Sequence, residues 1–450
     1  MPQKLIIIGA GMATGRALEH LFEIAPEAYQ VTLFNAEPRG TYNRIMLSLV
    51  LTGDKSFDDI LTHTDEWYEE KGGVCRFGEE IINIDRSSKT VTSDTGDVVN
   101  YDKLIIATGS NPFIIPLPGH DLEGVIAYRD LDDTNTMIAL GSKTKAKAVV
   151  IGGGLLGLEA AAGLAMRGVS VTVVHIMSHL MERQLDEAAG SLLSKELTNK
   201  GITVKCAANS KEILGKHGRV KALLLDDGTE LPCDLLVMAV GIRPSVALAV
   251  EAELATGRGI LVDDHMVTSD ASILALGECV EHNGDVFGLV APIFEQAQVL
   301  AKTLAGQEAR FVNTEVATKL KVTGCDLFSA GDFSSNDDRE DIIYHDPALG
   351  VYKRLVIENK RIVGAVMYGD TQDGTWFHRL ITGRDDISAM RETLIFGPAY
   401  QADAPPDPML AVTASPANAE ICGCSGPTES PDMNAKHVNE SNALHDRTAA

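Results

Sequence analysis

Residues 152–175 read GGGLLGLEAAAGLAMRGVSVTVVH, and this stretch decides the fold. The apolar run AKAVVI before it predicts a buried strand, its Ala-rich middle predicts a helix, and VSVTVV at 169–174 predicts a second strand. Gly152, Gly154 and Gly157 have the G-x-G-x-x-G spacing at which a pyrophosphate can approach the backbone of a helix N-terminus. The stretch therefore predicts a β-α-β unit that binds a dinucleotide.

The N-terminus carries a second version of the same plan. In KLIIIGAGMATG (4–15), Gly9 and Gly11 follow a strand-like run, while Thr14 occupies the third glycine position. A side chain at that position must be accommodated where helix and strand pack together. Glu37 follows the next strand, VTLF, and is the acid expected on a ribose. An ordinary tight turn with a solvated acid is the alternative interpretation.

The second unit ends on His175, where an acid is typical. A carboxylate there would bind the ribose hydroxyls of NAD and repel the extra phosphate of NADP. A neutral imidazole can donate or accept a hydrogen bond, and a protonated one can attract phosphate. The choice between NADH and NADPH therefore stays open, as does a surface role for His175 without ligand contact.

Composition excludes several classes of partner. The chain has 450 residues, 45% of them hydrophobic, and a net charge of −24, which argues against nucleic acid and anionic membranes as partners. No apolar run reaches the roughly 18 residues of a membrane-spanning helix, and the N-terminus lacks the apolar core of a signal peptide. The seven cysteines are mostly isolated, which indicates a reducing, cytoplasmic location rather than a disulfide framework.

Two glycine-rich β-α-β units imply that the chain binds two dinucleotides. A nicotinamide donates a hydride, whereas a flavin can accept the electron pair and release the electrons singly. A chain that holds both would convert paired electrons into single ones.

Three further motifs resemble the FAD-dependent pyridine nucleotide reductases: LIIATGSNP (104–112), VMAVGIRP (237–244) and TSDASILALGEC (268–279). In that family the first two contain the turns between the FAD and NAD(P)H domains. The resemblance thus implies cofactor-site roles for Ala107, Thr108, Gly109 and Gly241.

The third motif ends in Gly277-Glu278, and the resemblance implies that this acid binds the ribityl chain of FAD. Most members have Asp there. The extra methylene of Glu278 should move the carboxylate by about one bond length. The resemblance further implies that Arg44 pairs with the FAD phosphates and that Glu159 positions the nicotinamide. A surface role for Arg44 and a helix-dipole role for Glu159 are the alternatives.

Within this superfamily, the chain resembles the flavoprotein part of the large subunit of assimilatory NAD(P)H-nitrite reductase. The matching stretches are AEPRGTYNRIMLS (36–48), VVHIMSHLMERQLD (173–186), GECVEHNGDVFGLVAPIFEQAQVLA (277–301) and TKLKVTGCDLFSAG (318–331). The resemblance implies an FAD enzyme that takes electrons from NADH or NADPH and delivers them to a separate redox protein. That partner would be a nitrate or nitrite reductase subunit or a small iron–sulfur protein. A rubredoxin or ferredoxin reductase of another pathway, and a non-catalytic nucleotide-binding redox sensor, are the alternatives.

No residue needs to be a catalytic acid, base or nucleophile, because hydride passes directly between stacked rings. No C-x-x-C or C-x-x-x-x-C pair occurs, so a dithiol relay is not expected. Rubredoxin and ferredoxin reductases often carry Lys after the Leu-Ser near the flavin, where this chain has Leu49. Cys279 is expected to be a small buried side chain. Cys422 and Cys424 resemble half of a [2Fe–2S] module, but a cluster needs four ligands, so no metal site is expected in this chain alone. A cluster that a partner protein completes is the alternative.

We therefore expect an α/β fold with two Rossmann-like dinucleotide-binding domains, for FAD and NAD(P)H, plus a small C-terminal α+β domain. The oligomeric state stays open, with a homodimer as one possibility. The expected boundaries are 1–112 and 242–310 for the discontinuous FAD-binding domain, 113–241 for the NAD(P)H-binding domain with its leading connector, 311–400 for the α+β domain, and 401–450 for a mobile, proline-rich tail.

Overall fold

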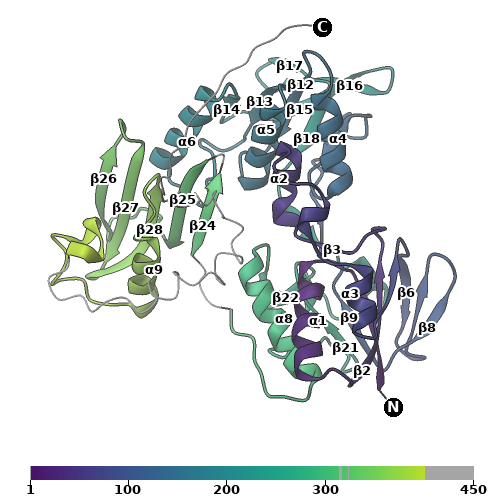
Figure 1. Ribbon diagram of the computed structural model, residues 1–450. Helices are drawn as coiled ribbons and strands as arrows, with labels where there is room; N and C mark the ends of the chain where they lie inside the picture. Colours follow the sequence, from purple (N-terminus) through teal and green to yellow (C-terminus); the bar gives the residue numbers. More distant parts are fainter. Residues whose placement is uncertain (1, 314–316, 323, 401–450) are drawn as a thin grey trace, which may run out of the picture. The chain divides into compact units, whose positions relative to one another are not determined.

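The computed structural model describes residues 2–313, 317–322 and 324–400 (Figure 1). The predicted mobile tail, with Cys422 and Cys424, lies outside the described residues.

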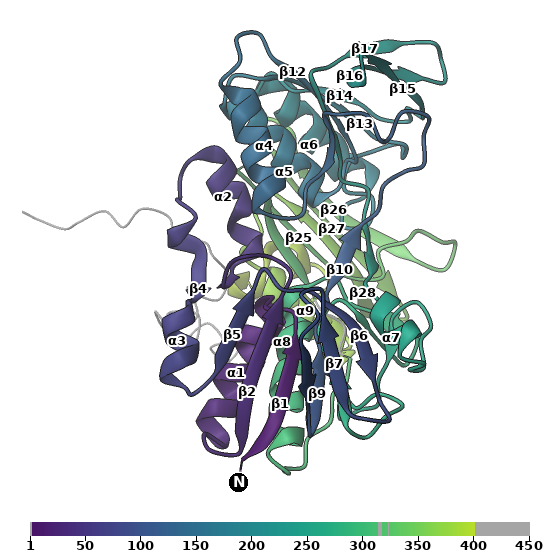
Figure 2. The same ribbon diagram turned by 90° about the vertical axis from the view of Figure 1, so that its right-hand side faces the viewer.

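The first sheet contains five parallel strands in the order β21-β9-β1-β2-β5. In that order the strands are Ile273–Ala275, Lys103–Ile106, Gln3–Ile8, Tyr29–Asn35 and Val74–Phe77. Helix α1 (Met12–Ile24) connects β1 to β2 and packs beside α8 (Val290–Leu304), as Figures 1 and 2 show. A parallel sheet that is covered on both faces favours continuous apolar strands, and the side chains from Leu5 to Ile8 are buried accordingly.

The second sheet repeats this arrangement. Its five parallel strands follow the order β11-β18-β12-β13-β14. In that order the strands are Val125–Ala127, Leu235–Met238, Lys147–Ile151, Ser170–Val174 and Thr203–Lys205. Helix α5 (Leu155–Met166) connects β12 to β13, as α1 connects β1 to β2. The two glycine motifs therefore occupy equivalent turns, between the third and fourth strands of each sheet. The sheets differ at one edge, where β21 comes last in the chain and β11 comes first.

Two short strands carry the chain between the sheets. β10 (Ser110–Pro112) leaves the first sheet, β19 (Ile242–Pro244) returns from the second, and the two pair antiparallel. Gly109 and Gly241 precede them with φ of +66° and +109°, a region open to glycine at little cost. The backbone N–H of Ser245 donates to the Gly109 carbonyl at 2.9 Å, which ties the two crossings together.

The C-terminal part contains a separate antiparallel sheet of five strands, in the order β24-β25-β28-β27-β26. In that order the strands are Thr318–Val322, Cys325–Gly331, Arg361–Tyr368, Val351–Glu358 and Glu340–Asp346. Helix α9 (Gly374–Gly383) packs Trp376 and Phe377 against one face, which is the core of this domain. The predicted fold class is thus confirmed: two Rossmann-like units and a small α+β domain.

Smaller elements complete the described structure. Helix α2 (Leu47–Thr52) packs Leu51 against Gly163 of α5, so a segment of the first unit joins the core of the second. Further helices are α3 (Asp65–Glu70), α4 (Leu131–Gly141), α6 (Glu187–Asn199) and α7 (Ala247–Glu251). Two three-stranded sheets are also present, β6-β7-β8 (Ile81–Asp85, Thr90–Ser93, Val98–Asn100) and β15-β16-β17 (Ser210–Lys216, Arg219–Leu225, Glu230–Pro232).

The other face of the C-terminal sheet packs on the second Rossmann unit. Tyr352 and Tyr368 share a hydrophobic core with Leu185 and with Leu193 of α6. At the edge of this core the Tyr352 hydroxyl donates to Asp186 Oδ2 at 2.7 Å. Arg354 Nη1 approaches the same oxygen at 3.3 Å. The loop that precedes α6 is therefore fixed to the C-terminal sheet.

This contact gives a first prediction. The variant Tyr352→Phe keeps the buried ring but loses the hydrogen bond to a carboxylate, so unfolding should become easier by about 1.5–3 kcal/mol. The control Tyr344→Phe alters a half-exposed tyrosine on the neighbouring strand β26 and should change the free energy of unfolding by less than about 0.5 kcal/mol. Urea unfolding measures both. Equal stability of the two variants would contradict the role given to the Tyr352–Asp186 bond.

Candidate functional site

The first glycine turn is shaped by backbone approaching backbone. Gly9 has a φ of +104°, and a Cβ added there would lie 2.3 Å from the carbonyl oxygen of Ala107. Gly11 is the N-cap of α1 in an extended conformation, and a Cβ there meets nothing within 4 Å. Thr14 fits in the third glycine position because its hydroxyl donates to the Gly9 carbonyl at 2.6 Å. The turn is thus closed on the sheet side and open in front of the helix.

The second turn has the same geometry. Gly152 has a φ of +121°, and a Cβ there would lie 2.1 Å from the carbonyl oxygen of Ala239. Gly154 is the N-cap of α5, again extended and with open space around its Cβ position. A Cβ on Gly157 would lie 2.1 Å from the Gly152 carbonyl oxygen, so only glycine fits there. A different feature of the local geometry therefore favours glycine at each of the three positions.

Matching backbone hydrogen bonds close the two turns. In each turn, the N–H of the first glycine donates to the end of the strand after the helix (β2 or β13). The N–H of the alanine that follows β9 or β18 donates to the end of the strand before the helix (β1 or β12). These bonds are Gly9 N–H to Phe34 O (2.8 Å) and Ala107 N–H to Ile8 O (2.8 Å) in the first turn, and Gly152 N–H to Val174 O (2.9 Å) and Ala239 N–H to Ile151 O (2.8 Å) in the second.

The N-termini of α1 and α5 differ from those of α3, α4 and α6. The latter three begin with a side-chain cap from Thr64, Asp130 or Asp186, and each has an acidic residue in its first turn. Helices α1 and α5 have neither. Free backbone N–H groups at the positive end of a helix dipole bind anions, so both turns fit a pyrophosphate.

The first turn is bordered by two predicted site residues that contact each other. Glu37 forms an ion pair with Arg44 and accepts from the Tyr42 hydroxyl at 3.0 Å. Arg44 also donates to the carbonyl oxygen of Arg129 at 3.1 Å. The predicted ribose acid and the predicted phosphate cation therefore lie side by side.

Glu278 is the second predicted acid of this site, and a residue of β10, one of the two strands that join the sheets, donates a hydrogen bond to it. Ser110 Oγ donates to Glu278 Oε2 at 2.6 Å, and Arg129 forms an ion pair with the same carboxylate. Gly277, at a φ of +91°, donates its N–H to Gln296 Oε1 at 2.9 Å. Sequence reasoning missed Arg129 and Gln296.

Gln296 belongs to α8 and is fully buried, and its Nε2 has no partner among the described residues. An orphaned buried amide next to Gly277 is a donor available to a ligand. In the sequence, Gln296 lies within the matching stretch 277–301, but nothing there indicated a role for it.

The turns between the sheets lie beside this group. Thr108 Oγ1 donates to the carbonyl oxygen of Ser245 at 2.8 Å, and a Cβ on Gly109 would lie 3.7 Å from the Arg129 guanidinium. The structure thus brings Ala107, Thr108 and Gly109 together with Gly9 and Glu278. Gly241 lies on the returning crossing and has open space around its Cβ position.

His175 has a different environment from a free ribose ligand. It is 7% exposed, its Nδ1 accepts the N–H of Gly153 at 3.1 Å, and its Nε2 lies 3.0 Å from Glu182 Oε2. Both ring nitrogens therefore have protein partners. Sequence reasoning did not identify Glu182.

Glu159, in the second turn of α5, is a desolvated carboxylate. Burial raises the pKa of Glu159 to about 7. No cation pairs with it in the described part of the chain. Burial and the nearby Glu159 charge also raise the pKa of the buried Tyr128 hydroxyl. With a pKa of about 7, the Glu159 carboxyl changes its charge near neutral pH.

The cysteines offer no redox pair in the described residues. Cys75, Cys206, Cys233, Cys279 and Cys325 are all free thiols. Cys279, next to Glu278, is fully buried, and burial raises the pKa of its thiol to about 11. It stays protonated at neutral pH and acts as a packed side chain.

No group of His, Cys, Asp or Glu side chains in the described ranges has the arrangement of a metal site. Likewise, the helices that the structure describes include none with the length and apolar character needed to cross a membrane.

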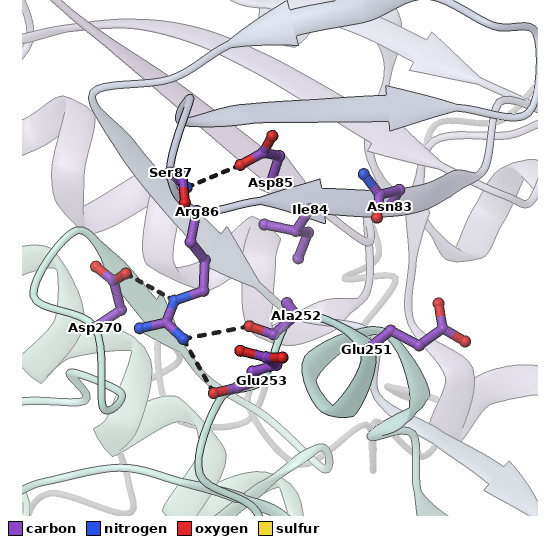
Figure 3. Close-up of a pocket in the computed structure, with 9 residues that line it drawn as sticks. All are labelled: Asn83, Ile84, Asp85, Arg86, Ser87, Glu251, Ala252, Glu253 and Asp270. Carbon is purple, nitrogen blue, oxygen red and sulfur yellow. Dashed lines mark hydrogen bonds and ion pairs between the residues drawn. The ribbon is translucent and has the colours of Figure 1, made fainter.

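A cavity of about 610 Å³ lies elsewhere, between β6 and the end of α7 (Figure 3). Arg86 crosses it, donating to Asp270 at 3.0 Å and to the carbonyl oxygen of Glu253 at 3.0 Å. The Arg86 guanidinium is thus paired within the protein. None of the glycine-turn residues lines this cavity.

Comparison with known proteins now identifies the class. Residues 3–302 match the family described as pyridine nucleotide-disulphide oxidoreductase, and residues 317–384 match the rubredoxin NAD+ reductase C-terminal domain. The chain belongs to the pyridine nucleotide-disulphide oxidoreductase family, which confirms the resemblance drawn from the motifs.

Individual relatives refine this picture. The chain is 45% identical to nitrite reductase [NAD(P)H] of Bacillus subtilis, over 94% of this chain and 52% of the relative. It is 36% identical to the assimilatory nitrate reductase electron transfer subunit of the same organism, over 97% of this chain and 56% of the relative. The crystal structure of NADH:rubredoxin oxidoreductase from Clostridium acetobutylicum superposes with a TM-score of 0.74 at 28% identity, covering 88% of this chain and 99% of that one. The chain spans about half the length of the two Bacillus relatives.

The family uses FAD and NAD(P)H, which confirms the predicted cofactors. The residues present fit these groups. Two uncapped helix N-termini face open space at Gly11 and Gly154, where two pyrophosphates need room and backbone donors.

The open space at the two N-caps gives a second prediction. Leu fits the extended backbone of Gly11, so Gly11→Leu should fold but block the pyrophosphate and purify with less than about a tenth of the normal flavin. Gly154→Leu is the matched control: it should keep its flavin and lose nicotinamide nucleotide binding. Absorbance spectra and NADH titration distinguish them. A Gly11→Leu protein with full flavin content would contradict the assignment of the first turn.

A third prediction follows from Glu159. In the folded protein Glu159 keeps its proton up to a pH of about 7, whereas the ordinary pKa of a glutamic acid is 4.5, so the free energy of unfolding falls as pH rises through this window. Glu159→Gln avoids that loss. Without nicotinamide nucleotide it should exceed the wild type in unfolding free energy by on the order of 1–3 kcal/mol at pH 8, and the gain should shrink by pH 5. Glu230→Gln, on exposed β17, is the control, and a pH-independent gain for Glu159→Gln would contradict the desolvation argument.

Proposed function

We propose that this chain oxidises NAD(P)H through bound FAD and passes the electrons to a separate redox protein in nitrate or nitrite assimilation. The observation that carries the proposal is the pair of equivalent open glycine turns, at Gly9–Gly11 and Gly152–Gly154, joined by the antiparallel crossings β10 and β19. Two dinucleotides held by one chain are what hydride transfer between a nicotinamide and a flavin requires.

The residues around the turns have binding and positioning roles in this proposal. The N-termini of α1 and α5 hold the pyrophosphates of FAD and NAD(P)H. Glu37 takes the FAD ribose, and Glu278 the ribityl chain. Arg44 and Arg129, which form ion pairs with these acids, are the cations that we propose for the FAD phosphates. When bound, FAD accepts a hydride and can release the electrons one at a time.

Glu159 lies in the second turn of α5, two residues after Gly157, and is proposed to position the nicotinamide. Its carboxylate has no cation partner among the described residues, so its charge state is set by solvent access. A ring that covers α5 would exclude water from this carboxyl and favour its protonated form.

The exit of the electrons does not involve a described dithiol. The five described cysteines are unpaired, and the Cys279 thiol is buried and protonated. We therefore expect transfer directly from the flavin to a docked protein. The free thiols also support a reducing, cytoplasmic compartment.

The names of the relatives support the pathway. One is called a nitrite reductase and another an assimilatory nitrate reductase electron transfer subunit. Since the chain spans about half of each, their complete activities are not assigned to it. A nitrate or nitrite reductase subunit is the proposed acceptor.

A rubredoxin reductase is the second candidate, because residues 317–384 match the C-terminal domain named for that activity. Leu49 in place of the Lys found in many such reductases is the feature against it. An acceptor assay decides between them. Flavin-loaded protein is reduced with NADH under anaerobic conditions and mixed in turn with a nitrate reductase catalytic subunit, a nitrite reductase catalytic subunit and rubredoxin. Faster reoxidation by rubredoxin than by either reductase would overturn the first candidate, and a protein that NAD(P)H does not bleach would overturn both.

A fourth prediction concerns residues after Tyr400. Every described element that holds the two turns ends before residue 305, so truncation after Tyr400 should leave flavin content and NADH oxidation by ferricyanide within about twofold of the full chain. Since Cys422 and Cys424 supply two of the four thiolates that a cluster needs, the full chain should contain no stoichiometric iron or acid-labile sulfide. Iron that is lost when both cysteines are changed to Ser would contradict this.

A further inference from the structure

The two Rossmann units place different residues at the same point of the backbone. In the first, Ile8 pairs with Phe34, and Asn35 follows; in the second, Ile151 pairs with Val174, and His175 follows. Asn35 and His175 are therefore structural equivalents.

The side chains of Asn35 and His175 also accept equivalent hydrogen bonds from the glycine turns. Asn35 Oδ1 accepts the N–H of Ala10 at 3.3 Å, and His175 Nδ1 accepts the N–H of Gly153 at 3.1 Å. Ala10 and Gly153 each follow the first glycine of their turn. In a typical Rossmann site, an acid occupies this strand end and binds the ribose. Here the strand-end residue is instead occupied with the turn in both units.

The ribose acid of the first unit comes later in the chain. Glu37 lies two residues after Asn35, just beyond the end of the same strand. By this comparison the second unit should also have a carboxylate beyond His175. Glu182 is the carboxylate that the structure brings there, since its Oε2 lies 3.0 Å from His175 Nε2. Because Nδ1 accepts from Gly153, Nε2 carries the proton and donates to Glu182.

The loop 176–186 folds back over the glycine turn to make this contact. The N–H of Met181 donates to the Gly153 carbonyl at 3.0 Å, and Leu180 and Met181 are fully buried. The Glu182 side chain stays 26% exposed, and only its Oε2 is bonded within the described structure. One carboxylate oxygen therefore remains for a ligand at the end of β13.

Exposed apolar side chains lie next to this carboxylate in the chain. Ile176 is 65% exposed and Met177 is 46% exposed, directly after His175. Apolar surface beside a polar anchor is the usual lining of a site for a flat aromatic base. These two residues are suited to contact the adenine of a dinucleotide whose ribose reaches Glu182.

We propose that Glu182, oriented by His175, binds the adenosine ribose hydroxyls of NADH and makes this chain select NADH over NADPH. The inference rests on the proposed function and names the donor within it. A free carboxylate oxygen accepts hydrogen bonds from the 2′- and 3′-hydroxyls. The same charge repels a 2′-phosphate.

The neighbouring Arg183 is the feature that would oppose this selection. Its side chain is exposed and could pair with a 2′-phosphate. Glu182 is bonded to His175, whereas Arg183 makes no ion pair with another described residue. A contact therefore fixes Glu182 at the strand end, whereas no described ion pair fixes Arg183 there.

The test compares flavin-loaded Glu182→Gln with the wild type. Gln can still accept from His175, so the loop should keep its position, but the charge is lost. Calorimetry with NAD+ and NADP+ should show about tenfold weaker NAD+ binding and a fall of tenfold or more in the preference for NAD+. With ferricyanide as acceptor, KM for NADH should rise while kcat at saturation stays within about twofold, because the flavin end is untouched.

Two controls make the result specific. Glu187→Gln, an exposed carboxylate on the first turn of α6, should change neither affinity. Arg183→Ala should leave NAD+ affinity unchanged. An unchanged ratio of NAD+ to NADP+ affinity in Glu182→Gln would overturn the assignment, and so would a wild type that prefers NADP+ and loses that preference in Arg183→Ala. A wild type that binds neither nucleotide would instead overturn the proposed function.

Discussion

The close approach of one backbone segment to a glycine of another determines the geometry of both nucleotide sites. At Gly9 and at Gly152, a side chain would collide with the carbonyl oxygen of Ala107 or Ala239, the residue that follows the neighbouring strand. Glycine removes the collision, and its positive φ then turns the chain into the helix. The helix N-terminus is thereby left without a capping side chain and faces open space. The anion binding that we propose at both turns depends on this one steric condition.

Much of this could be read from the sequence, because it is local. Glycine spacing, strand-like runs and the Ala-rich helix lie within about 25 residues of each other, so β-α-β units and turn positions follow from periodicity and propensity. The substitution at Thr14 also has a local solution, since its hydroxyl bonds to Gly9 within the same turn.

The polar partners of the site could not be read in this way. Arg129 and Glu278 are 149 residues apart, and Gln296 is brought to Gly277 by the packing of α8. Glu182 reaches His175 only because the loop between them folds back onto Gly153. Such contacts depend on tertiary structure, and no spacing rule in a single sequence predicts them. For the same reason the sequence placed His175 at the strand end correctly but gave no indication that both its nitrogens are bonded.

The loop that carries Glu182 shows how the C-terminal sheet contributes to the nucleotide site. One end of the loop is tied to the glycine turn through Met181 and Gly153. The other end is Asp186, which caps α6 through Ala189 and accepts from Tyr352 of β27. A segment fixed at both ends loses little conformational entropy when a ligand binds, so more of its contact energy appears as affinity. A carboxylate that must distinguish two ligands by one phosphate needs such support, because a free loop could move the charge away. If Glu182 binds the nucleotide as proposed, the C-terminal sheet therefore has a structural role at that site, because it fixes one end of the loop.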